Sequence, residues 1–261
     1  MVAQLRRLSR RRSERAEQGR FLVEGSTLVG LALDAGATVE VLLRDGESPP
    51  EEAERVLAER AAASGARLVE LAPGAMSRVT DTVTPQPLAA VVTKPTWALA
   101  ELLADAASRG RPLLVLADVN DPGNAGTLMR SAEAAGCAGV VCCGGVDPFG
   151  PKTVRASAGA VFLVPVVEHP QVRLALAALG DARIHRIGLA ARGGVDLDLA
   201  DLRGPVAFVL GSESHGLPDG LDRALDEVVT IPMVGRSESL NVAMAGTLAV
   251  FEAARQRRAA T

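Results

Sequence analysis

Several sequence features that define common protein classes are absent from this chain of 261 residues. Cysteine occurs only at Cys137, Cys142 and Cys143, too few and too close for a disulfide framework or a CxxC-type metal site. No apolar run reaches the roughly 18–20 residues that a membrane span needs. The first residues are rich in arginine and lack the apolar stretch of a secretory signal. We therefore expect a cytoplasmic protein that needs neither a membrane nor a metal.

The fingerprints of the common nucleotide-binding and hydrolase sites are also missing. The sequence has no GxGxxG after the first strand of its second half and no GxxxxGK[ST]. The stretch from Gly211 to Gly216 does not fit the GxSxG turn of a serine hydrolase. A dinucleotide-dependent oxidoreductase is disfavoured because its glycine-rich turn is absent.

Lysine is nearly absent, since Lys94 and Lys152 are the only lysines among 28 basic residues. The net charge of −3 does not suggest a nucleic-acid binder. Residues 1–20, however, hold seven arginines and two glutamates, so that this segment has a net charge of about +5 and the remainder of the chain one of about −8. The planar guanidinium suits phosphate. We expect one basic helix here that carries Arg7, Arg11 and Arg15 on one face; a frayed, solvated terminus is the alternative. The candidate phosphate-binding residues, on a nucleic-acid partner, are Arg7, Arg10, Arg11, Arg15 and Arg20.

The chain reads as two α/β domains. Expected strands at residues 21–25, 39–43, 67–71 and 88–92 alternate with helices at 26–35, 51–64 and 73–79, which predicts a small α/β/α sandwich over residues 1–95. Residues 96–111 read as a linker with an alanine-rich helix. Residues 112–261 alternate in a Rossmann-like way, with strands at 113–118, 138–143, 161–167, 184–190, 205–210 and 228–233. The continuous apolar run of the first of these is typical of a parallel sheet buried on both faces. Helices are expected at 124–135, 152–158, 171–179 and 221–227, with Asn124 as an N-cap.

The chemistry concentrates near the C-terminus, in residues 231–258. A polar loop that contains Arg236, Ser237, Glu238, Ser239 and Asn241 leads directly into a helix that is apolar on nearly every face. Such a helix is buried on more than one side, and its N-terminal N–H groups attract an anionic or carbonyl-rich ligand. A simple N-cap at Ser239 or Asn241 is an equally open interpretation.

Three motifs resemble those of the SpoU/TrmH family of RNA ribose 2′-O-methyltransferases. The first is Asn124 with Arg130 six residues later, on a helix after the first strand. The second is a strand that ends in Gly211-Ser-Glu213-Ser-His-Gly-Leu. The third is IPM at 231–233 followed by SLNV at 239–242. The segments RRRSERAEQGRFLVEG and TVTPQPLAAVV resemble the N-terminal substrate-binding domain of many such enzymes, a ribosomal-protein-like RNA-binding fold. Pro87 stands where relatives usually have glycine.

The resemblance implies a deep trefoil knot, a homodimer and S-adenosylmethionine as methyl donor. The implied cofactor-binding residues are Leu210, Gly211, Ile231, Met233 and Leu240. The implied catalytic residues are Arg130, Asn124, Glu213, Ser239 and Asn241. An arginine normally stays protonated, so Arg130 is expected to stabilise the developing alkoxide and orient the RNA phosphate; as a base it would need a strongly depressed pKa. Glu213 would orient Arg130 or Asn241, the two asparagines would hold loops and substrate, and Ser239 would bind ribose or phosphate.

The resemblance therefore predicts a methyltransferase acting on RNA ribose 2′-OH groups. Ribosomal RNA, with 23S rRNA as the candidate, is preferred over tRNA because of the N-terminal domain. A tRNA methyltransferase and a non-catalytic RNA-binding or ribosome-assembly protein on the same scaffold are the alternatives. The motifs encode neither the target nucleotide nor the choice between a housekeeping and an antibiotic-resistance role.

Overall fold

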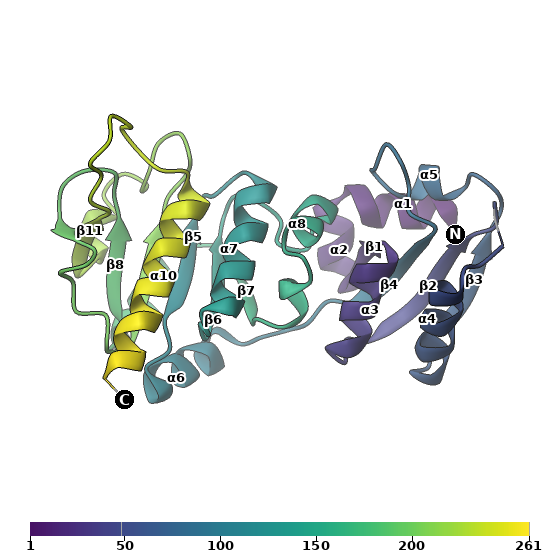
Figure 1. Ribbon diagram of the computed structural model, residues 1–261, viewed down its shortest axis with the longest axis horizontal. Coiled ribbons are helices and arrows are strands. Elements are labelled where there is room, and N and C mark those ends of the chain that lie inside the picture. The colour runs from purple at the N-terminus through teal and green to yellow at the C-terminus, as the bar shows by residue number, and fades with distance from the viewer. Residues whose placement is uncertain (48, 261) are drawn as a thin grey trace. The chain divides into compact units, whose positions relative to one another are not determined.

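The computed structural model describes residues 1–47 and 49–260, so that Thr261, the last residue of the predicted second domain, lies outside it. The chain forms two compact units (Figure 1). Unit 1 comprises residues 1–95 and 149–163, and unit 2 comprises residues 96–148 and 164–261. Among the described residues, no helix is long and apolar enough to cross a membrane.

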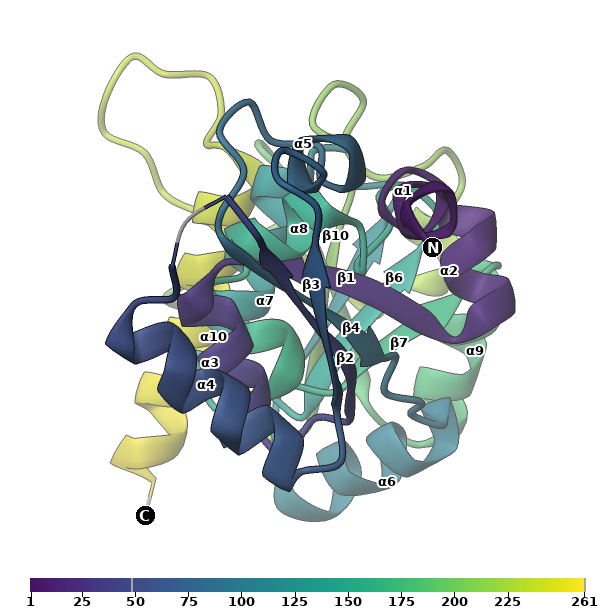
Figure 2. The same cartoon turned by 90° about the vertical axis from the view of Figure 1, so that its right-hand side faces the viewer.

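Unit 1 is a four-stranded sheet between two layers of helices, as the sequence predicts. The strands β1 (Arg20–Glu24), β2 (Val39–Asp45), β3 (Arg67–Leu71) and β4 (Leu88–Thr93) lie in the order β1-β4-β2-β3. Only the β2–β3 pair is parallel. The helices are α1 (Val2–Arg10), α2 (Arg12–Gln18), α3 (Ser26–Asp34), α4 (Glu52–Ala63) and α5 (Met76–Val79). Helices α1 and α5 lie on one side of the sheet, and α3 and α4 on the other (Figure 2).

The basic N-terminal segment differs from the prediction of a single helix. Arg11 is extended, with φ −117° and ψ 119°, and separates α1 from α2. Arg15 then points inward, and its Nη1 donates hydrogen bonds to the carbonyl oxygens of Leu8 at 2.6 Å and Ser9 at 2.8 Å. These carbonyls close α1 and have no partner within the helix. The guanidinium supplies one, so Arg15 is buried and does not share an exposed face with Arg7 and Arg11.

The second part of unit 1 is a segment that the sequence-based division places with residues 112–261. It contains α8 (Pro151–Ala156) and the 3₁₀ turn η1 (Ala160–Phe162). Phe21 of β1 packs between Phe149 and Phe162, with ring centroids 5.2 and 6.0 Å away. Arg155 of α8 forms an ion pair with Asp81 at 2.9 Å. Residues 149–163 therefore complete the face of the sheet that α3 covers in part.

Unit 2 is built on a seven-stranded sheet in the order β7-β6-β5-β10-β8-β11-β9, with every pair parallel. Its strands are β5 (Leu113–Ala117), β6 (Gly139–Cys143), β7 (Val166–His169), β8 (His185–Leu189), β9 (Val195–Asp196), β10 (Val206–Leu210) and β11 (Glu227–Thr230). Its helices are α6 (Leu99–Arg109), α7 (Pro122–Ala134), α9 (Val172–Asp181) and α10 (Val242–Ala259). All residues of β5, β6 and β10 are buried, as expected for a parallel sheet covered on both faces.

Four local predictions for unit 2 need correction. The expected strand at 161–167 begins only at Val166, after η1. The expected helix at 221–227 is the 3₁₀ turn η2 (Asp222–Ala224), and β11 already begins at Glu227. Helix α7 begins at Pro122, because Asp121 rather than Asn124 is its N-cap. The segment expected as a linker contains α6, which buries Leu102, Leu103 and Ala106 in the core of unit 2.

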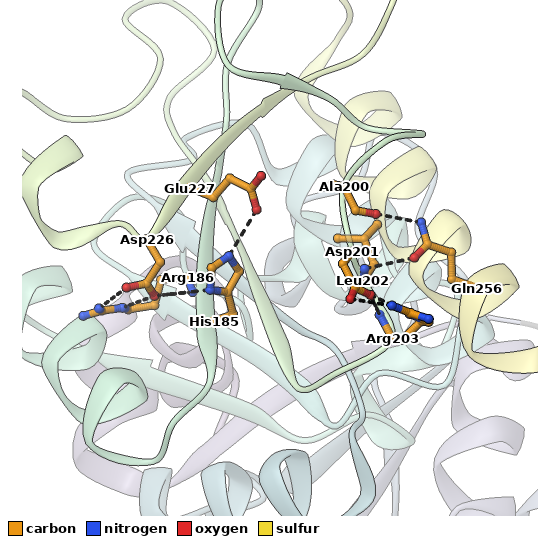
Figure 3. Close-up of polar contacts among 9 residues, drawn as sticks. All are labelled: His185, Arg186, Ala200, Asp201, Leu202, Arg203, Asp226, Glu227 and Gln256. Carbon is orange, nitrogen blue, oxygen red and sulfur yellow. Dashed lines mark hydrogen bonds and ion pairs between the residues drawn. The ribbon is translucent and has the colours of Figure 1, made fainter. Parts of the chain in front are cut away.

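Polar contacts fix the amino-terminal edge of the sheet and the last turns of α10 (Figure 3). Arg186 of β8 donates to Asp226 through its backbone N and its Nε, both at 2.8 Å. His185 Nε2 lies 3.1 Å from a carboxylate oxygen of Glu227. Gln256 of α10 accepts from Leu202 N at 2.9 Å and donates to Ala200 O at 3.0 Å. These contacts lie at the end of the strands opposite to the one where the pocket described next is found.

Candidate functional site

A pocket of about 440 Å³ lies at the carboxyl ends of the central strands of unit 2. Its lining comes from four segments: the end of β8 and residues 190–191, the end of β10 with the following turn, the end of β11 with Ile231 and Met233, and the start of α10. Open parallel sheets bind their ligands at this edge. The volume falls within the range of about 300–1,000 Å³ that is typical of small-molecule sites.

All five residues expected to bind the cofactor line this pocket. They are Leu210, Gly211, Ile231, Met233 and Leu240. Three of the expected catalytic residues, Glu213, Ser239 and Asn241, line it as well. The second and third motifs therefore bring together eight residues from two stretches of the chain, 210–213 and 231–241.

A tight turn after β10 sets the shape of the second motif. Ser212 and Gly216 exchange two backbone hydrogen bonds of 2.9 Å, and Gly216 has a φ of +70°, which glycine adopts without strain. A side chain at Gly211 would begin 2.0 Å from the carbonyl oxygen of Gly216, so only glycine allows this closure. The turn projects Glu213 toward the N-terminus of α7.

The three motifs meet in one chain of hydrogen bonds. Glu213 Oε1 accepts from Asn124 Nδ2 at 2.9 Å. Asn124 Oδ1 in turn accepts from Asn241 Nδ2 at 3.0 Å. Asn241 Oδ1 accepts from the backbone N–H of Ala243 at 2.8 Å and so caps α10. Asn241 therefore has both of the roles considered for it, because its oxygen caps the helix while its nitrogen holds Asn124.

Glu213 is the fixed anchor of this chain. Besides Asn124, it accepts from the backbone N–H groups of Asn120 at 3.2 Å and Asp121 at 3.1 Å. Partial burial opposes ionisation, but the hydrogen bonds from Asn124 and the backbone lower the pKa of Glu213 below its ordinary value. A carboxylate with a lowered pKa is a poor proton acceptor at neutral pH. Glu213 thus acts on Asn241 through Asn124.

Arg130 lies apart from this network. It is exposed on α7 and is not among the residues that line the pocket. It lies six residues after Asn124, which at 3.6 residues per turn places it about 120° away around the helix axis. The structure therefore brings Asn124 but not Arg130 to the mouth of the pocket within a single chain.

Sequence reasoning missed half of the pocket wall. Leu189, Ala190 and Ala191 follow β8, and Val242 and Ala245 belong to the first turns of α10. The end of the predicted strand at 184–190 was the available signal, since the carboxyl ends of neighbouring parallel strands meet at one edge. Nothing about small apolar residues marks them as ligand contacts in the sequence alone.

The five arginines of unit 1 that the sequence suggests for RNA binding differ in their exposure and in the partners that they already have. Arg7, Arg10 and Arg11 are exposed, although Arg7 also pairs with Glu14 at 3.0 Å. Arg20 forms an ion pair with Glu40 at 2.9 Å. Arg15 is buried against the end of α1, so it is not available to an RNA phosphate. Among the described residues, no group of three or more His, Cys, Asp or Glu side chains is arranged to hold a metal ion.

Comparison with known families agrees with this geometry. Residues 111–251 match the SpoU rRNA methylase family, and residues 1–90 match the MRM3-like substrate binding domain. The chain belongs to the SpoU rRNA methylase family. The resemblance drawn from the three motifs is thereby confirmed, and the N-terminal resemblance is confirmed for the substrate-binding domain.

Relatives in the SpoU family match over nearly the whole chain. The 23S rRNA (guanosine(2553)-2′-O)-methyltransferase RlmP of Bacillus subtilis is 34% identical over 92% of this chain and 90% of its own length. The SpoU methyltransferase AviRb of Streptomyces viridochromogenes, solved with AdoMet, superposes with a TM-score of 0.84 at 29% identity, covering 99% of this chain and 98% of that one. An AdoMet-bound rRNA methyltransferase of Sinorhizobium meliloti gives 0.84 at 30% identity, over 98% and 94%. The mixed α/β fold with its parallel sheet is the one these enzymes share.

Proposed function

We propose that this SpoU-family chain transfers the methyl group of S-adenosylmethionine to a ribose 2′-OH of ribosomal RNA, in the 23S molecule. The observation that carries the proposal is the hydrogen-bond chain from Glu213 through Asn124 to Asn241. It joins all three motifs at the mouth of a pocket of suitable size. Relatives named as 23S rRNA 2′-O-methyltransferases match most of the chain and support the choice of substrate.

The pocket suits an adenosine with an attached amino-acid chain. Leu210, Met233 and Leu240 offer apolar walls, and Gly211 has no side chain, so that a base can approach the backbone there closely. The cofactor supplies a sulfonium methyl group, which needs only an in-line nucleophile. Ser239 lies on the same lining and has a hydroxyl that can bind ribose or phosphate.

The side chains of the site position the nucleophile and stabilise its charge. A ribose 2′-OH is a weak nucleophile at neutral pH and develops negative charge as its proton passes to solvent water. In our proposal the guanidinium of Arg130 stabilises this charge and holds the neighbouring phosphate, as a fixed cation rather than as a base. Because Arg130 does not line the pocket of its own chain, it acts on RNA bound at the pocket of the second copy in the homodimer proposed below. Asn124 and Asn241 keep the substrate-facing ends of α7 and α10 in register.

We infer a homodimer from α10. Met244, Leu248 and Phe251 follow one another at helical spacing and are 58, 47 and 43% exposed. The prediction that this helix is buried on several sides therefore does not hold within one chain, and a second copy would cover the exposed stripe.

Leu248→Glu should yield monomers in light scattering after size-exclusion chromatography, whereas Leu174→Glu on α9, 56% exposed, should not change the mass. Dimers of both variants would contradict this interface.

The trefoil knot also remains a proposal, supported by the path of the chain. Strand β11 lies two places from β10 in the sheet, with β8 between them. The next helix, α10, packs against α7 and β10. Residues 231–241 must therefore cross back over the carboxyl end of β8. In a knotted chain, these residues would pass through the loop that precedes β11. We further propose that the enzyme works in the cytoplasm, where its rRNA substrate is made.

The proposed reaction is tested by cofactor binding and methyl transfer measured side by side. Calorimetry should show S-adenosylmethionine binding by the wild type, by Arg130→Ala and by the control Arg55→Ala, an exposed arginine of α4. Radiolabelled methyl groups should reach unmodified 23S rRNA with the wild type and Arg55→Ala. Arg130→Ala should lose roughly 100- to 1,000-fold in rate, the usual effect of removing a charge-stabilising donor.

Other outcomes of this experiment point to the alternatives. Label in tRNA but not in rRNA would support a tRNA methyltransferase. RNA binding without cofactor binding by the wild type would contradict the reaction and leave a non-catalytic RNA-binding or ribosome-assembly protein.

A further inference from the structure

Unit 1 has a small cavity that no motif predicted. It lies between α1 and the sheet face beneath it and has a volume of about 90 Å³. Its apolar wall consists of buried side chains from α1, β2 and β4, namely Leu5, Leu8, Leu43 and Val91. Its remaining wall is polar and more exposed, and includes Gln4, Gln18, Arg20, Glu40 and Arg67.

The size of the cavity limits what it can hold. Sites that enclose a whole small molecule measure about 300–1,000 Å³. A cavity of about 90 Å³ has room for only a few water molecules, each about 30 Å³. It therefore suits the edge of one flat group that is inserted from a larger ligand whose remainder stays outside.

Glu40 gives the cavity a hydrogen-bond acceptor. Its Oε1 accepts from Arg20 Nε at 2.9 Å and from Thr93 Oγ1 at 2.9 Å. Both contacts use the same oxygen, and no described residue donates to Oε2. The carboxylate is held in place by the ion pair yet can still accept from an N–H donor of a ligand. Gln4, Gln18 and Arg67 add donors at the opening.

The surface beside the cavity is complementary to a polyanion. Helix α1, which forms one wall, carries exposed Arg6, Arg7 and Arg10, and exposed Arg11 and Arg12 follow it. Five guanidinium groups within seven residues form a stripe that suits phosphates. A ligand with a flat apolar face, N–H donors at its edge and phosphates alongside is a nucleotide within a strand.

We propose that this cavity takes the edge of one unstacked nucleobase of the RNA substrate, while the arginines of α1 and Arg11 hold the adjoining phosphates. The inference rests on the proposed function, because it makes RNA the substrate. Bases that leave their stack are recognised by apolar contact with their faces and by hydrogen bonds to their edges. Guanine has two adjacent N–H donors on its Watson–Crick edge, so it matches the two lone pairs of the open Oε2 of Glu40 best.

The test uses short single-stranded RNA and the full chain. Fluorescence anisotropy measures binding of labelled hexanucleotides with a central G, A, C or U in a uridine background. The wild type should bind the G-containing strand most tightly. Val41→Phe, which fills the cavity from β2, should weaken binding of that strand roughly tenfold, the usual scale of one lost base contact. Val56→Phe, on the exposed face of α4 across the sheet, should bind like the wild type.

Glu40→Gln changes the edge contact without filling the cavity, and it should abolish the preference for guanine. Affinity of Val41→Phe and Glu40→Gln equal to that of the wild type, with no base preference, would overturn the proposal. If Val41→Phe does not fold, judged by circular dichroism, Arg67→Ala replaces it, with the same weakening expected and the same overturning result.

Cofactor calorimetry and methyl transfer separate this inference from the proposed function. All cavity variants should bind S-adenosylmethionine like the wild type, because their changes lie in unit 1. Methyl transfer that is equally efficient in cavity variants would refute the cavity's role alone. Cavity-dependent hexanucleotide binding by a wild type that transfers no methyl group would refute the reaction alone.

Discussion

Asn124 links the two strand-to-helix junctions of the site because an amide is both donor and acceptor. Its nitrogen is held by Glu213 and its oxygen holds Asn241. A carboxylate in its place could accept from Asn241 but could not donate to Glu213. The first motif singled out Asn124, and the sequence also suggested that Asn124 caps the helix, a role that Asp121 fulfils. The side chain is therefore available for the tertiary network.

Replacing Asn124 should therefore impair catalysis more than cofactor binding. Asn124→Ala removes one charge-assisted hydrogen bond, worth about 1.5–3 kcal/mol, so kcat/KM for methyl transfer should fall roughly 10- to 100-fold. Asn124→Asp should be worse, because it places a second carboxylate against Glu213. Asn120→Ala is the control, since that side chain donates only to Asp118 O. Equal activity of all three variants would show that the relay has no role in positioning.

Asp226 provides a prediction about pH. The hydrogen bonds of Arg186, opposed by slight burial, lower the pKa of Asp226 to about 2, below the ordinary value near 4. A carboxylate whose pKa is lower in the folded state stabilises the fold above its unfolded pKa, and loses this contribution as the pH falls through the folded pKa. Asp226→Asn should thus lower the urea midpoint at pH 7.

The difference between Asp226→Asn and the wild type should shrink between about pH 4 and pH 2. Because Asp226 is partly exposed, solvent screening keeps the effect small. The exposed Asp198→Asn serves as control and should follow the wild-type curve at every pH. A difference between Asp226→Asn and the wild type that persists unchanged at pH 2 would mean that packing, not charge, is responsible.

At the scale of elements, two glycines within helices have opposite surroundings. A Cβ at Gly246 of α10 would lie 2.4 Å from Leu128 Cδ2 and 2.7 Å from Leu210 Cδ1, and both leucines are fully buried. A Cβ at Gly30 of α3 would meet Leu57 Cδ2 at an ordinary 3.6 Å. Close packing of α10 on α7 and β10 therefore depends on the missing side chain.

Gly246→Ala should consequently destabilise the protein by roughly 1–3 kcal/mol through overpacking, whereas Gly30→Ala should stabilise it by about 0.4–1 kcal/mol. Urea unfolding measures both free energies. Since Leu210 also lines the pocket, Gly246→Ala should weaken S-adenosylmethionine binding as well. Stabilisation by both substitutions would show that Leu128 and Leu210 move aside freely.

The sequence predicted those elements whose burial leaves a simple pattern. Strands β5, β6 and β10 are buried along their whole length, and a continuous apolar run identifies them without knowledge of their partners. Strand β9 has two exposed residues and exists only through its pairing with β11, so no local pattern marks it. The break between α1 and α2 likewise depends on Arg15 turning inward to the carbonyls of Leu8 and Ser9.

At the scale of the whole molecule, the order of the chain does not match the order of its compact units. Phe149 lies in a stretch rich in glycine and proline that reads as a surface loop of the second domain. In the structure it is 1% exposed and packs on Phe21, which is 128 positions earlier. Sequence periodicity assigns a segment to its neighbours in the chain, so it cannot reveal a segment that packs elsewhere. The second and third motifs, by contrast, pointed to residues that line one pocket, because each of them specifies residue types at a junction between a strand and the loop that follows it.

This arrangement leads to a prediction about where a distant substitution acts. Phe149→Ala should cost about 3–5 kcal/mol, as large-to-small changes of buried aromatics do. Its effect on hydrogen exchange should appear in β1, where Phe21 loses its partner, rather than in β5 and β6, which are nearer in sequence. Leu163→Ala, 57% exposed at the end of the same segment, is the control and should leave β1 protected. Faster exchange confined to β5 and β6 would assign residues 149–163 to unit 2. Faster hydrogen exchange in β1 alone would mean that residues 149–163, although they lie within the methyltransferase part of the sequence, stabilise unit 1. A chimera that combines units from two relatives would then have to take residues 149–163 together with unit 1.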